Sequence, residues 1–130
     1  MKTELTYLVW VTVLTMLLWI PYVLDRMAVR GLADTVGYPE NPKPQSPWAV
    51  RLKAAHANAV ENLAVFAVLV LVANAVNVSS SATAGAAMLY FWSRVVHVVA
   101  YTFGMPWVRT LAFAGGWAAC VIFAWQILAH

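Results

Sequence analysis

Polar residues occupy one face of an otherwise hydrophobic stretch between residues 51 and 66. On a helix, at about 100° per residue, Arg51, Asn58, Glu61 and Asn62 fall on the same face. A carboxylate or a guanidinium in apolar surroundings needs a polar partner. We therefore expect this face to look inward, away from lipid, and to be a candidate for binding or catalysis.

A second polar stripe lies between residues 90 and 101. Tyr90, Arg94, His97 and Tyr101 follow one another at helical spacings and share a face. Glu61 is the only carboxylate deep in the hydrophobic sequence, so we predict that it forms an ion pair with Arg94, within one chain or between two copies of the chain. The pair alone requires no more than a role in fastening two helices. The whole stripe exceeds that requirement and indicates a functional site.

The two histidines near these stripes have different expected roles. His97 is a candidate general acid or base, and a satisfied hydrogen bond between helices is an equally good interpretation. His56 points away from the polar face of the first stretch. For His56 a structural or interfacial role is the favoured interpretation.

Arg109 begins the last hydrophobic segment, directly after a turn that contains Gly104 and Pro106, and Thr110 follows it. A cation at a water-accessible helix start can bind an anion or lower the pKa of a thiol. The alternative is a snorkelling arginine that only marks the membrane boundary. Position alone leaves both interpretations open.

Other common chemistries lack their residues. No cluster of His, Cys, Asp and Glu has the spacing of metal ligands, so we expect no metal site. No glycine-rich phosphate loop is present. Cys120 is the only cysteine, which excludes an intrachain disulfide and favours a packing role.

The composition indicates an integral membrane protein. Hydrophobic residues make up 63% of the 130 residues and charged residues 10%, and the mean hydropathy is +0.74. A soluble domain is typically about half apolar and about a quarter charged. The net charge of +3 is too small to favour nucleic acid as a partner. We expect one compact domain over residues 1–130, surrounded by membrane lipids.

Four hydrophobic segments are long enough to cross a membrane, at residues 5–24, 47–75, 82–103 and 107–128. They predict an all-α protein, a transmembrane bundle of four helices. Pro21 is expected to kink the end of the first segment. Four prolines predict an extended loop over residues 31–48. Ser46 is the expected N-cap of the second segment, with Pro47 at its first position.

Basic residues predict the orientation. Most of them lie in or beside the first loop, at Arg26, Arg30, Lys43, Arg51 and Lys53. Arg109 belongs to the loop at residues 104–109, and the loop between the second and third segments has no charge. The positive-inside rule therefore predicts two cytoplasmic basic loops and both termini on the opposite side.

Three motifs together resemble the signature of the MAPEG superfamily, the membrane-associated proteins in eicosanoid and glutathione metabolism, and in particular its microsomal glutathione transferase type. They are Ala55-His56-Ala-Asn58-Ala-Val-Glu61-Asn62, Arg94-Val-Val-His97-Val-Val-Ala-Tyr101 and Pro106-Trp-Val-Arg109-Thr110. The resemblance covers the whole chain, including the four spans, the long first loop and the short second loop.

The resemblance implies a homotrimer, with glutathione as co-substrate between neighbouring subunits near the cytoplasmic face. It implies a lipophilic small-molecule substrate that arrives from the bilayer. Arg109 matches the arginine that helps to activate the thiol. The positions that match the glutathione pocket, or place a cation beside it, are Asn58, Glu61, Arg94, His97 and Tyr101, together with Arg51 and either Arg26 or Arg30.

Two functional hypotheses remain open. Ala54 and Ala57 stand where many members of the family have arginines that hold the glutathione carboxylates. The absence of arginines at positions 54 and 57 favours a non-catalytic trimeric membrane protein that binds a lipid or a partner protein. The presence of Arg109 favours a transferase or peroxidase that uses glutathione or another thiol on lipophilic electrophiles.

Overall fold

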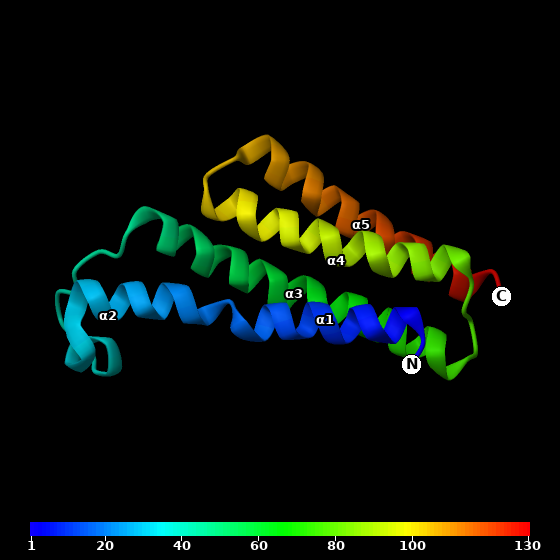
Figure 1. Ribbon diagram of the computed structural model, residues 1–130, viewed down its shortest axis with the longest axis horizontal. Helices are drawn as coiled ribbons and strands as arrows, with labels where there is room; N and C mark the ends of the chain where they lie inside the picture. Colours follow the sequence, from blue (N-terminus) through cyan, green and yellow to red (C-terminus); the bar gives the residue numbers. More distant parts are fainter.

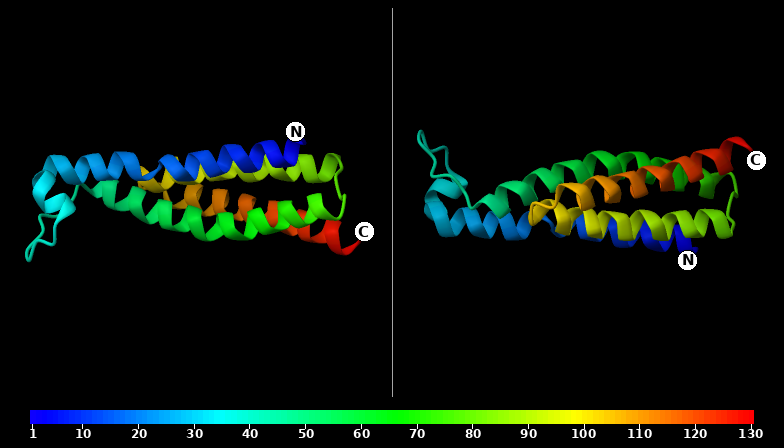
Figure 2. Two further views of the ribbon diagram at one scale, coloured as in Figure 1. Left: turned by 90° about the horizontal axis from the view of Figure 1, so that it is seen from below. Right: turned by 90° about the horizontal axis from the view of Figure 1, so that it is seen from above.

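The computed structural model describes residues 1–130 as an all-helical bundle (Figure 1). Its helices are α1 (Thr3–Leu17), α2 (Trp19–Val36), α3 (Pro47–Ala75), α4 (Ser81–Thr102) and α5 (Pro106–Leu128). Helices α1 and α2 follow each other as one long rod, so the bundle has four rods. Both termini lie at one end, and the α2–α3 and α4–α5 connections lie toward the other (Figures 1 and 2). The four-helix prediction is therefore confirmed.

The first rod is broken at Leu18, one turn before the expected kink at Pro21. The Leu18 N–H reaches back to the Thr15 carbonyl at 3.4 Å, three residues away rather than four. Proline has no N–H, and its ring crowds the carbonyl four residues earlier, which here belongs to Leu17. The break therefore falls in the turn that precedes the proline.

The loop predicted over residues 31–48 is shorter than expected. Helix α2 continues to Val36, across Gly31, whose φ of +80° interrupts the helical backbone. No proline lies between Gly31 and Pro39 to stop the helix from resuming, and the Thr35 hydroxyl donates to the Gly31 carbonyl. The predicted loop is thus wrong for residues 31–36, which are helical, and for residues 47–48, which begin α3, and residues 37–46 are non-helical with bends at 37, 40 and 41.

Helix α3 begins at Pro47 as predicted, but Ser46 does not cap it with its side chain. The Ser46 hydroxyl donates instead to Asp25 Oδ1, and the Ser46 N–H donates to Asp25 Oδ2 at 3.1 Å. Gln45 Nε2 also donates to Asp25 Oδ2 and to the Tyr22 carbonyl. Asp25 therefore ties the start of α3 to α2, and this contact replaces the expected N-cap.

The opposite end of the bundle contains a polar contact that sequence reasoning missed. The Ser80 side chain and Thr83 form a capping box at the start of α4. The Glu4 carboxylate, only 6% exposed, accepts hydrogen bonds from the Ser79 hydroxyl at 2.6 Å and the Thr83 hydroxyl at 3.0 Å. These bonds join α1 to the α3–α4 turn.

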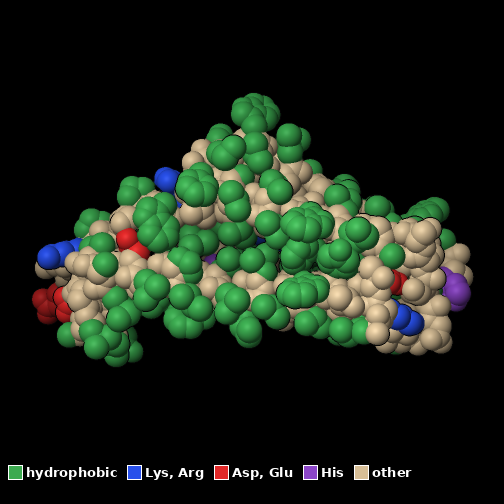
Figure 3. All heavy atoms as spheres, in the orientation of Figure 1, with side chains coloured by type: hydrophobic (Ala, Val, Ile, Leu, Met, Phe, Trp, Pro, Cys, Tyr) green, Lys and Arg blue, Asp and Glu red, His purple; other side chains and the backbone are tan.

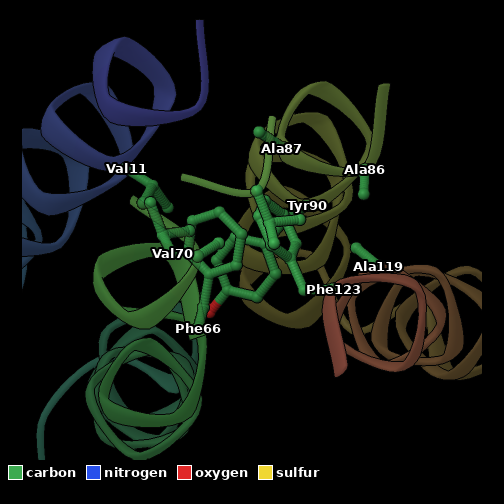
Figure 4. Close-up of a cluster of buried hydrophobic side chains, with 10 residues drawn as sticks. Val11, Phe66, Val70, Ala86, Ala87, Tyr90, Ala119 and Phe123 are labelled. Atoms are coloured by element: carbon green, nitrogen blue, oxygen red, sulfur yellow. The ribbon is translucent and has the colours of Figure 1, made fainter. Parts of the chain in front are cut away.

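The core is aromatic at its centre (Figure 4). Phe66 of α3 and Tyr90 of α4 stack with ring centroids 3.8 Å apart, and Phe123 of α5 meets Phe66 edge-on at 5.7 Å. Helices α4 and α5 form the most extensive helix pair. A Cβ atom at Gly115 would stand 2.5 Å from Ser93 Oγ, so this pairing depends on a residue without a side chain.

The outer surface is hydrophobic. On the face shown in Figure 3, charged side chains gather at the two ends and hydrophobic side chains cover the middle. All seven tryptophans are exposed, between 39% and 81%. Three of the four rods are long and apolar enough to span a membrane. Helix α4 is the remaining rod, since Ser93, Arg94 and His97 make it more polar, and all three are buried within the bundle.

Candidate functional site

The three predicted polar segments meet in one cavity of about 310 Å³. Helix α3 contributes Asn58, helix α4 contributes His97 and Tyr101, and the first turns of α5 contribute Arg109 and Thr110, with Phe113 one turn further along. Four predicted site residues, Asn58, His97, Tyr101 and Arg109, therefore line one space. They come together because one polar face of α3, the polar stripe of α4 and the start of α5 point toward the same region.

Arg94 lies behind this cavity and fixes two of its walls. Its side chain is 2% exposed, and its Nη2 donates to Asn58 Oδ1 at 2.8 Å and lies 3.3 Å from His97 Nδ1. A guanidinium has no acceptor atom, so His97 Nδ1 must be the acceptor. The imidazole is then neutral and carries its proton on Nε2, which leaves that N–H free to donate to another group.

Arg109 is held differently. Its Cζ atom lies 5.0 Å from the centre of the Tyr101 ring, which is a cation–π distance. The Tyr101 ring in turn meets His97 at 5.6 Å between ring centroids. No hydrogen bond within the chain uses the Arg109 guanidinium, and the residue is partly exposed. Its N–H groups are therefore available to an anionic ligand.

The predicted ion pair between Glu61 and Arg94 does not form within the chain. Arg94 uses Asn58 and His97 as its partners, while Glu61 is exposed. Glu61 lines a separate cavity of about 380 Å³ beside Tyr22, Lys53 and His56. Asn58 stands almost one turn before Glu61 and is the residue of that face that reaches Arg94, so the ion pair predicted within one chain is wrong.

The other predicted arginines do not line the cavity of Asn58 and Arg109. Arg51 Nε donates to the Thr102 carbonyl at 2.8 Å. Arg26 Nε donates to Gln45 Oε1 at 3.2 Å, and Arg30 Nε donates to the Lys43 carbonyl at 2.7 Å. Arg26 and Arg30 therefore hold the α2–α3 connection, and Arg51 joins α3 to the end of α4.

Two features of the site were not expected. Phe113 supplies an apolar wall, and one signal for it is its spacing of four residues from Arg109 along α5. The Tyr22 hydroxyl lies 2.8 Å from His56 Nδ1. This bond fits the structural role expected for His56, but the sequence offers no spacing rule that joins a residue of α2 to one of α3.

The fold and the cavity define a class: a helical membrane protein with a cation-containing polar cavity among three of its helices. The chain belongs to the MAPEG family, whose family model matches residues 7–129, nearly the whole chain. It is therefore a membrane protein of the superfamily of glutathione and eicosanoid metabolism. A search of curated protein sequences finds no match.

Proposed function

We propose that the protein is a transferase or peroxidase that uses glutathione or another thiol on lipophilic electrophiles. The observation that carries the proposal is Arg109, an arginine whose guanidinium makes no hydrogen bond within the chain, in one cavity with Asn58, His97 and Tyr101. An arginine with a purely structural role would donate its hydrogen bonds to groups of the protein. The N–H groups of Arg109 make none and can donate to a ligand.

The cavity supports thiol chemistry without a protein nucleophile. The thiolate is the reactive form of a thiol, and the Arg109 guanidinium would favour it over the neutral thiol. In the transfer reaction the sulfur forms a bond to the electrophilic carbon, the leaving group departs with the electron pair of its bond, and the thiol proton passes to water. The cavity would hold the two reactants together, which is a proximity effect.

Arg94 supports an anionic co-substrate. It is a buried cation whose hydrogen-bond partners within the chain are both neutral. A buried charge is costly unless an opposite charge or hydrogen bonds compensate it. A carboxylate of a thiol peptide in the adjacent cavity would supply the missing negative charge. It would attract the guanidinium electrostatically, and Asn58, which lines the cavity and accepts from Arg94, lies between the two.

Glu61 supports assembly with further copies of the chain, and we propose the homotrimer that the family resemblance implies. Glu61 is exposed on the apolar helix α3. An ionised side chain at the middle of a membrane helix costs about 2.5–3.5 kcal/mol on insertion scales, so lipid is a poor neighbour for it. A second copy packed on this face would cover Glu61 and enclose the open cavities. The basic connections at the opposite end from the termini would face the cytoplasm.

A non-catalytic membrane protein that binds a lipid or a partner is the second candidate. The observation that favours it is the exposed face of α3, where Ala54 and Ala57 present no charge to a ligand carboxylate. Thiol affinity then depends on Arg94 and Arg109 alone.

Calorimetric titration of the detergent-purified protein with glutathione, cysteine and other cellular thiols tests the first candidate. We expect saturable binding and a conjugation rate with an aromatic electrophile above the rate in solution. Lys43→Gln is a suitable control, since the substitution removes an exposed cation near the same end of the bundle and Lys43 does not line the cavity. Neither binding nor rate above background for any thiol would leave the non-catalytic protein as the better description.

A further inference from the structure

A third cavity, an apolar groove of about 510 Å³, lies where the first rod breaks. Its walls come from that break, from the start of α3 and from the end of α4, and the apolar side chains among them are Leu18, Trp48, Leu52, Val98, Val99 and Phe103. It shares no residue with the cavity that contains Arg109. Its volume lies within the range of about 300–1,000 Å³ that is usual for small-molecule sites.

Arg51 stands at the rim of this groove. It directly precedes Leu52 on α3 and follows Trp48 by three residues, so it belongs to the same helical turn as two wall residues. Its Nε donates to the carbonyl of Thr102, which also lines the groove. The guanidinium is therefore fixed at the end of the groove where α4 terminates.

The turn after α4 leaves room for this guanidinium. Gly104 has a φ of +71°, a left-handed conformation that favours glycine, and Arg51 Cζ lies 3.6 Å from where its Cβ atom would stand. No hydrogen bond within the chain uses the two terminal nitrogens of Arg51. The groove thus combines an apolar channel with a positioned cation at one end.

We propose that this groove binds a phospholipid of the surrounding bilayer, with one acyl chain against Leu52 and Val99 and the phosphate on the terminal nitrogens of Arg51. The arrangement matches an amphiphile, which carries a long apolar tail and an anionic head. Phosphate accepts charge-assisted hydrogen bonds from a guanidinium. Anionic phospholipids bind more tightly than zwitterionic ones, because Arg51 then meets an uncompensated negative charge.

Native mass spectrometry of the detergent-purified protein tests the site, with phosphatidylglycerol and phosphatidylcholine added in turn. We expect wild type to retain phosphatidylglycerol. Arg51→Gln should lose about fivefold in affinity, which is the change for one cation near a membrane surface. Lys53→Gln is the matched control, because this cation lies two residues away and lines another cavity. It should leave phosphatidylglycerol binding unchanged.

A second variant keeps the test independent of the Arg51–Thr102 bond. Val99 is 49% exposed and lines the groove, so Val99→Phe should fill it and displace the lipid without disturbing the core. Val96→Phe, at a 43% exposed position on the same helix outside the groove, should keep wild-type binding. Equal lipid retention by wild type, Arg51→Gln and Val99→Phe would overturn the proposal. Loss in Val99→Phe but not in Arg51→Gln would also overturn it, because the ligand would then make no use of the cation.

Discussion

The two arginines around the polar cavity are held in opposite ways. Arg94 is buried in α4, and its Nη2 contacts both Asn58 Oδ1 and His97 Nδ1, while its buried Nε has no partner within the chain. Arg109 begins α5, lies over the Tyr101 ring and makes no hydrogen bond within the chain. The difference shows that Arg94 holds two walls of the cavity, whereas the Arg109 guanidinium has no hydrogen-bond partner within the chain; in the proposed function it acts on the bound thiol. A change near Arg94 should therefore affect folding, and a change at Arg109 should affect chemistry.

The largest effect is expected at Asn58, the neutral partner of Arg94. Asn58→Leu leaves a buried guanidinium without its best acceptor, and a hydrogen bond to a charged group contributes about 1.5–3 kcal/mol. We expect a loss of about 2–3 kcal/mol in the free energy of unfolding, measured by denaturant titration in detergent. The double variant Asn58→Leu with Arg94→Met should lose less, since it removes the stranded charge as well. A double variant that is less stable than the single one would contradict this account of Arg94.

Arg109→Ala should act on rate instead of stability. We expect a rate of conjugation about tenfold lower near neutral pH, because a thiol without the guanidinium has a higher pKa and is less ionised. The free thiol titrates near pH 8.5, so the deficit should shrink as the pH rises through that value. Arg109→Lys should be intermediate, as it keeps the charge without the planar fork.

The controls for Arg109 are internal to the same experiment. The free energy of unfolding of Arg109→Ala should change by less than about 1 kcal/mol, since a partly exposed charge contributes little to stability. An active wild type with an unchanged rate and pH profile in Arg109→Ala would remove Arg109 from the mechanism.

Asp25 offers an intermediate test, outside the cavity. Asp25→Ala removes the acceptor of Ser46 and Gln45, which ties α2 to the start of α3. We expect a loss of about 1–2 kcal/mol, because each such bond contributes about 1 kcal/mol and the contact is close to water. Protease cleavage within residues 37–46 should be faster in the variant than in wild type. Asp34→Ala, in the exposed final turns of α2, should cleave at the wild-type rate.

Glu61→Gln should have the smallest effect on folding. Glu61 makes no ion pair within the chain, so its neutralisation should change the free energy of unfolding by less than about 0.5 kcal/mol. The same unfolding titration measures it. A loss above about 2 kcal/mol would mean that Glu61 is paired with a cation of another copy. Glu61 would then be held by a partner, as Arg94 is, and would no longer resemble Arg109, which has no partner.

Helical periodicity was sufficient to predict most of the fold. It placed α3 at its observed bounds and α4 and α5 within one residue of theirs, because Pro47, Gly104 and Pro106 punctuate long apolar runs. It ended the first segment at residue 24, although α2 runs to Val36, and it failed for residues 31–36, where the glycine at the start and the prolines beyond suggested a loop. A single residue with positive φ is enough to redirect a helix, and the helix resumes when the next residues permit it.

The candidate site was partly predictable for a related reason. Periodicity assigns Asn58 and Glu61 to one face of α3, but it does not determine which of them faces Arg94. That choice depends on the rotation and depth of α3 against α4, set by the stacked Phe66 and Tyr90. The cavity residues on α4 and α5 needed no such detail, because His97 and Tyr101 are one turn apart and Arg109 follows a short turn.

The Glu4 contact can form only late in the synthesis of the chain. Its partners Ser79 and Thr83 lie 75 and 79 residues later in the chain, so neither exists while α1 is being synthesised. Until Ser79 and Thr83 have been synthesised, the Glu4 carboxylate lacks both of these hydroxyl donors. This polar contact at the termini end of the bundle therefore forms only after more than half of the chain has been made, whereas the contacts of the first rod with α3 do not depend on it.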